Sequence, residues 1–256
     1  MQTMNDAARQ EAFGLKMMET INAATVALSI SLGHRTGLLD AMGGRGPSTT
    51  DEIAQAAGLN ERYVREWLGA MVTGGIIEFD PETRTYRLPN EHAAWLTRKS
   101  SPNNLAASMQ WIAVLGGVED QITEAFTHGK GVPYDQYHRF HEVMAEESYQ
   151  SVVCALTDHI LPLEPGLIDR LKSGIRVLDV GCGSGRAMNH LAKLFPKSQF
   201  TGYDASPVAV EFARSEARRQ SLENSWFVVQ DVAQFQDSEA FELITAFDAI
   251  HDQAQP

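Results

Sequence analysis

The stretch VLDVGCGSGRA, Val177 to Ala187, is an apolar run with one acid that leads into three alternating glycines. Residues 176–180 have the composition of a buried strand, and a helical pattern starts at Ala187. Gly181, Gly183 and Gly185 allow a tight turn and a close approach of backbone to ligand, because glycine has no Cβ. Ligands of open parallel sheets bind beyond the carboxyl ends of the strands, where the amides of the next helix also point. The stretch therefore predicts a ligand-binding strand–turn–helix.

Three kinds of ligand compete for this turn. A phosphate-binding P-loop requires Lys and then Ser or Thr after its last glycine, whereas Arg186 and Ala187 follow Gly185. A dinucleotide fingerprint requires a glycine where Arg186 stands. Asp179 places a carboxylate that would repel a pyrophosphate and attract an ammonium or a sulfonium. The residues favour a nucleoside that carries a cationic amino-acid part, and a plain tight turn is the alternative.

From Gly174 onward, strand and helix patterns alternate, which predicts right-handed crossovers and a parallel α/β sheet. The expected strands are Arg176–Val180, Gln199–Tyr203, Trp226–Val229 and Leu243–Phe247, and the expected helices are Ala187–Phe195 and Val208–Gln220.

Acids end three successive strands of this pattern. Asp204 ends QFTGYD, about 25 residues after Asp179, near the offset at which an acid binds ribose hydroxyls. Asp231 ends WFVVQD, where a carboxylate can accept from an adenine amino group with Val232 beside the ring. Because the carboxyl ends of parallel strands meet at one edge, the three acids are expected to converge.

The stretches VLDVGCGSG, FTGYDASP and FVVQDVAQF resemble the successive motifs of class I S-adenosylmethionine (SAM)-dependent methyltransferases, and ELITAFDAIHD resembles their fourth strand. The resemblance implies a Rossmann-like fold, SAM as cofactor, and transfer of its methyl group to a small-molecule acceptor. In the family the glycine loop cradles the methionine moiety, and the acids matching Asp204 and Asp231 bind ribose and adenine. The cofactor-binding residues implied are Asp179, Gly181, Cys182, Gly183, Gly185, Asp204, Ala205, Asp231, Val232, Phe247 and Asp248.

The family's sheet has seven strands, and the fourth-strand pattern is followed closely by Pro256. We therefore expect a partial sheet of four strands, in a fragment or truncated product, with residues 243–247 as an apolar edge prone to aggregation. Expressed alone, it would transfer no methyl group. His251 follows this strand, and two interpretations stay open: a general base on the acceptor, or a solvated loop histidine.

The N-terminal part is mainly helical and resembles the winged-helix module that precedes many such enzymes. Residues 12–39 have a helical pattern, with Phe13, Met17, Ile21, Ala24 and Leu28 three or four apart. Helix, turn, helix and hairpin then follow. Their signals are Thr49 and Glu52 at capping-box spacing, Gly58, a cap at Asn60, an apolar face of Tyr63, Trp67, Leu68 and Met71, Gly74-Gly75, and β-like runs at Ile76–Phe79 and Thr85–Leu88.

The 256 residues carry a formal net charge of −12, of which residues 1–100 account for −2 (10 Lys+Arg against 12 Asp+Glu) and the rest for −10. This balance, and the near-neutral second helix of the winged-helix segment, disfavour a nucleic-acid partner. Two cysteines without metal-ligand spacing indicate a reducing compartment and no metal site. With no signal-peptide or membrane-spanning pattern, the expected location is the cytoplasm.

The expected organisation is a winged-helix-like domain at 1–100, a helical connecting or lid region at 101–172, and an incomplete Rossmann-like SAM-binding domain at 173–256. The leading function is a small-molecule methyltransferase that forms a homodimer through its N-terminal domain. The alternatives are a winged-helix DNA-binding regulator with SAM as effector, and a non-catalytic remnant.

Overall fold

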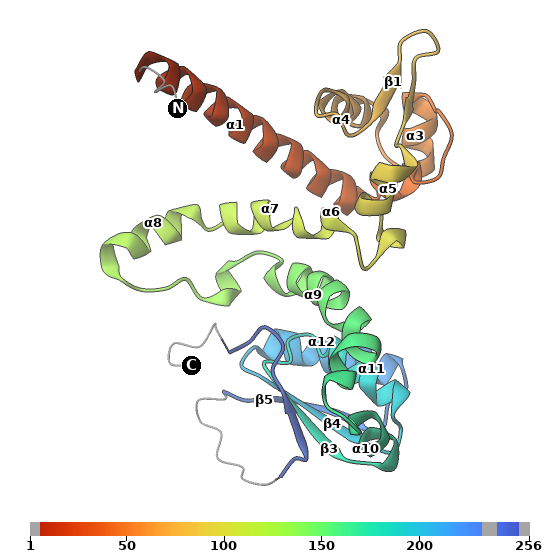
Figure 1. The fold of residues 1–256 in the computed structure, drawn as a ribbon, viewed down its shortest axis with the longest axis vertical. Helices are drawn as coiled ribbons and strands as arrows, with labels where there is room; N and C mark the ends of the chain where they lie inside the picture. The colour runs from red at the N-terminus through yellow and green to blue at the C-terminus, as the bar shows by residue number, and fades with distance from the viewer. Residues whose placement is uncertain (1–5, 232–239, 251–256) are drawn as a thin grey trace, which may run out of the picture. The chain divides into compact units, whose positions relative to one another are not determined.

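The structure, a computed structural model, describes residues 6–231 and 240–250. It divides into two compact units, Met1–Phe140 and His141–Pro256 (Figure 1). The first is mainly helical, and the second contains a parallel four-stranded sheet. The expected fold class, α/β with a mainly helical N-terminal part, is confirmed.

The first unit begins with α1, Asp6–Thr36, a helix of 31 residues. Only its C-terminal end is buried, at Ile30, Ser31, Gly33 and His34. There the ring of Trp67 packs so closely on Gly33 that a Cβ would collide with it, and its Nε1 donates to the carbonyl of Ser29 at 2.8 Å. Residues 6–25, N-terminal to this contact, are exposed.

The helix–turn–helix follows α2, Leu38–Met42, and consists of α3, Thr50–Ala57, and α4, Glu61–Thr73. The capping box of Thr49 and Glu52 and the cap at Asn60 are both formed, as the sequence predicts. The prediction that Tyr63 belongs to the buried apolar face of α4 is wrong, because its side chain is 77% exposed. Val64 is buried in its place, because it lies on the side of Leu68 and Met71 that faces the core.

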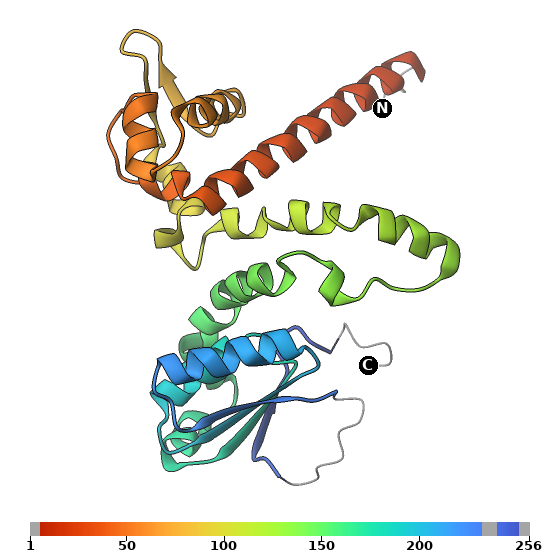
Figure 2. The ribbon, with the colours of Figure 1, turned by 180° about the vertical axis from the view of Figure 1, so that it is seen from behind.

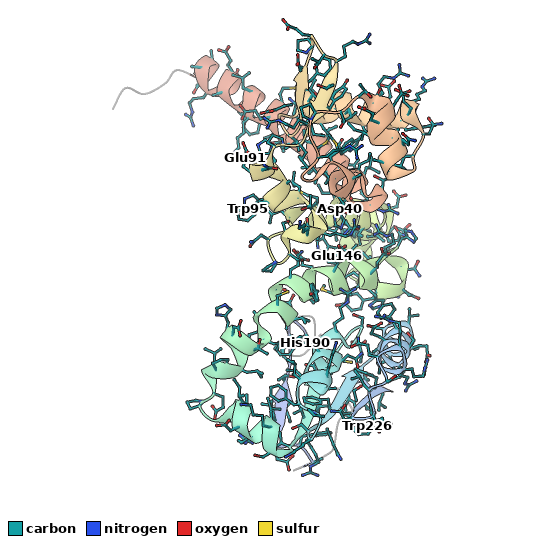
Figure 3. All side chains as sticks on the ribbon, turned by 90° about the vertical axis from the view of Figure 1, so that its right-hand side faces the viewer. Asp40, Glu91, Trp95, Glu146, His190 and Trp226 are labelled. Carbon is teal, nitrogen blue, oxygen red and sulfur yellow. The ribbon has the colours of Figure 1, made fainter. Side chains whose placement is uncertain are left out.

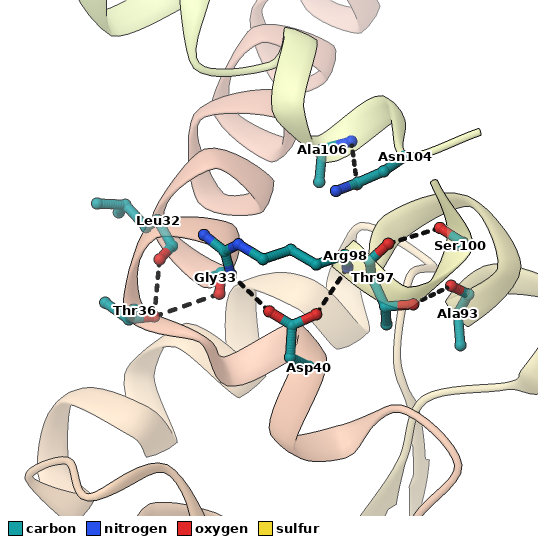
Figure 4. A network of polar contacts seen from close by, with 10 residues as sticks. All are labelled: Leu32, Gly33, Thr36, Asp40, Ala93, Thr97, Arg98, Ser100, Asn104 and Ala106. Carbon is teal, nitrogen blue, oxygen red and sulfur yellow. Dashed lines mark hydrogen bonds and ion pairs between the residues drawn. The ribbon is translucent and has the colours of Figure 1, made fainter. Parts of the chain in front are cut away.

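The wing is a short antiparallel hairpin of β1, Glu78–Asp80, and β2, Thr85–Arg87. It leads into α5, Asn90–Leu96, and the 3-10 turn η1, Arg98–Ser100. Figure 4 shows how this end of the domain is tied to α2: the carboxylate of Asp40 accepts from the backbone N–H of Arg98 at 2.7 Å and from its guanidinium. Thr97 adds an internal bond to the carbonyl of Ala93.

The rest of the first unit is a run of short helices: α6 (Leu105–Ser108), α7 (Trp111–Gly116), α8 (Glu119–His128) and the 3-10 turn η2 (Tyr134–Gln136). Aromatic rings hold the run together around Phe140. Their centroids lie 4.7 Å from Phe140 for Tyr134, 5.4 Å for Trp111 and 5.9 Å for Tyr137.

The second unit contains most of α9, Phe140–Ser151, which is followed by the short turns η3 (Val153–Ala155), η4 (Leu156–Ile160, a π-helix) and η5 (Leu161–Leu163) and by α10 (Leu167–Ser173). The α/β part then alternates β3 (Arg176–Val180), α11 (Arg186–Leu194), β4 (Gln199–Asp204), α12 (Pro207–Arg219), β5 (Ser225–Val229) and β6 (Leu243–Thr245). The expected strands and helices are present, with ends shifted by at most two residues.

All four strands of this sheet are parallel, in the order β5-β4-β3-β6. The chain moves from β3 outward to β4 and β5 and then returns to pair β6 with the other side of β3. Glu242 fixes this return, because it accepts from the backbone and the guanidinium of Arg176 at the start of β3. The reversal of strand order places a topological switch point between β3 and β6.

One face of the sheet is packed against helices. Val177, Phe200 and Phe227 from three strands share a core with α10, α11 and α12, and α12 lies along one side of the sheet in Figure 2. Residues of the other parity face the opposite way. Among them Trp226, labelled in Figure 3, is 48% exposed and Ile244 is 57% exposed, whereas Leu178 in the central strand is fully buried.

Within the described ranges, no single helix is long and apolar enough to cross a membrane. Two helical segments joined by a sharp bend, Phe140–Leu163 and Leu167–Ser173, together have the length and the apolar composition of a membrane span.

Candidate functional site

Ligands of open α/β sheets bind at the carboxyl ends of the strands where the strand order reverses. In this chain that place is formed by the end of β3, the glycine turn that follows it, the end of β4 and the facing residue of β6. We call the set Asp179, residues 181–185, residues 204–206 and Thr245 the switch-point site. The structure therefore brings most of the residues expected from the sequence to one edge of the sheet.

The three glycines of the turn all have positive φ, at 70°, 52° and 68° for Gly181, Gly183 and Gly185. Only glycine adopts such angles without cost. Their surroundings differ: a Cβ on Gly185 would lie 2.5 Å from the ring of Phe227, and one on Gly181 would collide with Ala249. Gly183 has no atom within 4 Å of that position. The outer two glycines serve packing, and the middle one leaves space in front of the turn.

Backbone bonds tie the turn to β4. The carbonyl of Tyr203 accepts from the N–H groups of Gly181 and Cys182, at 2.8 and 3.0 Å. Gly202 permits this approach, because a Cβ there would lie 2.6 Å from the Sγ of Cys182 and 2.7 Å from Phe227. The turn is thus held against the neighbouring strand.

Asp204 connects the turn to the next helix. One carboxylate oxygen accepts from the N–H of Gly183 and the other from the N–H of Ser206, both at 2.8 Å. Each oxygen of an ionised carboxylate has a second acceptor site. Asp204 therefore fixes the turn and can still receive hydroxyl groups of a ligand.

Asp179 is a buried acid, 3% exposed. Its Oδ1 accepts from the hydroxyl of Thr245 on β6 at 2.8 Å. Burial raises the pKa of Asp179 to about 7, the hydrogen bond from Thr245 lowers it, and the charge of Asp204 raises it. A carboxyl group in this state is poised to ionise when a cation lies beside it.

Cys182 lies within the turn but has the properties of an inert thiol. Burial raises its pKa well above the ordinary range, and the charges of Asp179 and Asp204 act in the same direction. Since the thiolate is the reactive form, Cys182 stays an unreactive loop residue at neutral pH. Over residues 6–231 and 240–250, His, Cys, Asp and Glu form no cluster suited to a metal ion.

The other predicted cofactor-binding residues follow the ends of β4, β5 and β6 or lie outside the described ranges. Ala205 is exposed next to Asp204, and Asp231 is exposed two residues beyond the end of β5. Phe247 packs partly against the core, and Asp248 has a positive φ of 56° and is exposed. Val232 and His251 lie outside the described residues.

Three residues in or beside the site are not among the residues that the sequence predicts to bind the cofactor. Thr245 hydrogen-bonds Asp179 from a strand 66 positions away, and Gly202 lies inside a strand rather than in a turn. His141 on α9 lies 3.1 Å through its Nε2 from the hydroxyl of Ser206, which caps α12. A glycine within a strand is the one local hint of close backbone approach.

Comparisons with known proteins agree with this arrangement. Residues 24–98 match the Rv2258c-like winged HTH domain, and residues 171–256 match a methyltransferase domain. The malonyl-[acyl-carrier protein] O-methyltransferase of Bacillus cereus is 28% identical over 117 residues, which cover 46% of this chain and 38% of that protein. The chain therefore spans about two fifths of this relative's length.

Two solved structures share the fold across both units. The mitomycin 7-O-methyltransferase MmcR has a TM-score of 0.66 at 20% identity and is covered to 74% by 97% of this chain. Human N-acetylserotonin methyltransferase, solved in complex with SAM, has a TM-score of 0.61 at 16% identity and is covered to 74% by 99% of this chain. The chain thus has an N-terminal segment that matches the Rv2258c-like winged helix-turn-helix model, a C-terminal segment that matches a methyltransferase domain model, and the fold of these solved structures.

Proposed function

We propose that the chain binds SAM at the switch-point site and takes part in the transfer of its methyl group to a small-molecule acceptor, a step that residues 1–256 expressed alone are not expected to complete. The observation that carries this proposal is the buried carboxylate of Asp179 directly ahead of a turn whose middle glycine faces open space. A buried acid suits a ligand with a positive charge and opposes the pyrophosphate of a dinucleotide.

The residues of the site fit the parts of SAM. Asp179 would face the ammonium or sulfonium, Gly181, Cys182, Gly183 and Gly185 would surround the methionine moiety, and Asp204 would receive the ribose hydroxyls. Ala205, Asp231, Val232, Phe247 and Asp248 complete the proposed set. When bound, SAM supplies an electrophilic methyl group for an in-line displacement, and the chain's residues contribute mainly by orienting the two reactants.

His251 is proposed as the base that takes a proton from the acceptor, and it lies outside the described residues.

We further propose the three-part division at residues 100 and 172, a homodimer formed through the N-terminal domain, and a cytoplasmic location. The two free cysteines support the cytoplasmic location.

Binding measurements with three adenosine-containing ligands test the proposed cofactor. Calorimetry with the full chain should detect binding of SAM and of S-adenosylhomocysteine, and no binding of NAD at the same concentration. A labelled-methyl assay against phenolic, carboxylic and amine acceptors then tests transfer. Preference for NAD over SAM would contradict the proposal, because a pyrophosphate would then tolerate the carboxylate of Asp179.

The affinity for SAM should rise with pH and level off above about 7. Free Asp179, with its pKa raised from 3.8 to about 7, holds a proton below that pH, and a cationic ligand requires the ionised form. Each pH unit below 7 should therefore weaken binding by up to about tenfold. The stability of the ligand-free fold follows the opposite trend. It should fall as the pH rises from 3.8 to about 7, because Asp179 keeps its proton in the folded chain over this range and loses it in the unfolded chain.

Two variants assign this dependence to Asp179. Asp179→Asn should remove the slope, and Thr245→Val should move its midpoint to higher pH, because the hydrogen bond from Thr245 lowers the pKa of Asp179. Dissociation constants measured by calorimetry from pH 5.5 to 8.5, in buffers of matched ionic strength, give both readouts. A wild-type affinity that is flat across this range would rule out the proposed pairing.

The winged-helix segment should not bind DNA tightly. The exposed residues of α4 include Arg62, Arg65 and Glu66, and Arg65 already pairs with Glu61 at 3.3 Å. A DNA-reading helix needs unpaired cations for phosphates. Gel shifts over a salt series should show weak binding without sequence preference; tight binding to one duplex with a steep inverse salt dependence would favour the regulator instead.

A further inference from the structure

Ser206 connects the acid proposed for the ribose to a helix that precedes the sheet. Its backbone N–H donates to Oδ1 of Asp204 at 2.8 Å. Its hydroxyl oxygen lies 3.1 Å from Nε2 of His141 on α9, 65 positions earlier in the chain. All three residues belong to the second unit. A chain of two hydrogen bonds therefore runs from α9 to the acid.

The hydroxyl of Ser206 also has a local task that does not need His141. Its oxygen accepts from the backbone N–H of Ala209 at 3.3 Å and so caps the start of α12. A serine hydroxyl has one proton to donate and two sites at which to accept. After the cap it keeps the proton and one acceptor site. His141 meets this remaining capacity whichever of its ring nitrogens carries the hydrogen.

The helix α9 presents His141 from a face that is turned toward the protein interior. Ala145 follows His141 by one helical turn on that face, and both Ala145 and Val143 are buried. The His141 side chain itself is half-buried. The imidazole is therefore held by a packed helix, which fixes one end of the chain of hydrogen bonds.

The orientation of the Asp204 carboxylate depends on the residues at both of its oxygens. Oδ2 accepts from the N–H of Gly183 and Oδ1 from the N–H of Ser206, so these two amides together set the plane of the group. Two neighbouring hydroxyls of a ribose need both oxygens in that plane, because hydrogen bonds weaken steeply when they are misaligned. Gly183 belongs to the glycine turn, whereas Ser206 begins a helix and has His141 as a support outside that helix.

We infer that His141 is a positioning residue for the ribose of the ligand: it holds Ser206, and Ser206 holds the carboxylate of Asp204 in the orientation that receives a vicinal diol. The inference rests on the proposed function, because it adds a residue to the same site. The role is indirect, since His141 acts through Ser206 on the recognition of the ribose and takes no part in the transfer of the methyl group.

Calorimetry of the full chain with a matched pair of ligands tests this role. The pair is S-adenosylhomocysteine and its 2′,3′-dideoxy analogue, which differ only in the ribose hydroxyls. His141→Ala should weaken binding of S-adenosylhomocysteine by roughly 2- to 12-fold, the range for the loss of one hydrogen bond between neutral groups. It should leave the affinity for the dideoxy analogue unchanged, because that ligand offers no hydroxyl to the carboxylate of Asp204.

Two further variants separate positioning from a general loss of structure. His141→Gln should restore most of the lost affinity, because the amide of glutamine can both donate and accept close to the position of Nε2. His159→Ala is the matched control, since His159 is exposed in the same unit. This variant should bind both ligands as the wild type does.

A double-mutant cycle tests the route through Ser206. Ser206→Ala removes the hydroxyl, and adding His141→Ala to this variant should weaken binding of S-adenosylhomocysteine no further. Additive losses would instead show that His141 acts by another route.

Four results would overturn the inference and leave the proposed function standing. They are full affinity in His141→Ala, an equal loss for both ligands, no recovery in His141→Gln, and additive losses in the double variant. A wild-type chain that binds neither ligand would refute the proposed function and this inference with it.

Discussion

Replacement of Gly183 by valine is expected to abolish SAM binding. A Cβ on Gly183 would enter the open space in front of the turn, where no atom lies within 4 Å, and the branched side chain would occupy the volume proposed for the methionine moiety. The change also strains the turn, because Gly183 has a φ of 52°, at a cost of roughly 1–2 kcal/mol for a residue with a side chain. Calorimetry with SAM gives the readout.

Gly166→Val is the matched control for strain. Gly166 belongs to the same unit, has a φ of 80° and also has open space around a built Cβ, but it precedes α10, away from the turn. It should lose a comparable amount of stability and keep the wild-type affinity for SAM. Unchanged affinity in Gly183→Val would show that the ligand does not approach this glycine.

Asp204→Ala is expected to weaken SAM and S-adenosylhomocysteine by similar amounts. Hydrogen bonds to a charged group contribute about 1.5–3 kcal/mol, which corresponds to a loss of roughly 10- to 150-fold in affinity. The two ligands share the ribose, and both would also lose the support that Asp204 gives to the N–H groups of Gly183 and Ser206. Dissociation constants for the two ligands provide the test.

Asp169→Ala serves as the comparison for Asp204→Ala. Asp169 lies on α10 with an 86% exposed side chain and makes only a surface pair with Lys172 at 3.6 Å. Surface pairs of this kind contribute about 0–1 kcal/mol, so ligand affinity should not change. If Asp204→Ala weakened one ligand and spared the other, the ribose assignment would be wrong.

The elements that were predicted correctly are determined by residues that are close together in the sequence. The capping box at Thr49 ends within three residues, and the run from Arg176 to Gly185 contains its own apolar stretch, acid and glycines. The parallel direction of the strands followed from a general rule, because strands that alternate with helices are joined by crossover connections. These features need no knowledge of distant contacts.

The errors and omissions concern contacts between distant segments. Tyr63 has the helical spacing of a core residue but is exposed. Val64, the next residue, lies on the face of α4 that packs against the core. The bond from Thr245 to Asp179 spans 66 positions, and that from His141 to Ser206 spans 65. No local pattern specifies such partners.

The sequence indicated the charge at Asp179 but not its protonation. Its ionisation depends on burial and on the neighbouring strands that bring Thr245 and Asp204 close. The apolar residues Phe13, Met17 and Ile21 of α1 show the reverse case. Their spacing was visible in the sequence as a helix signal, and only the structure shows that they are exposed.

Hydrogen exchange of the full chain with and without SAM tests the central claim most directly. We predict slower exchange on adding SAM for the amides of residues 181–185 and 204–206, which surround the proposed ligand, and no change in the β1–β2 hairpin of the other unit. No protection of the glycine turn at saturating SAM, or protection confined to the N-terminal unit, would contradict the account.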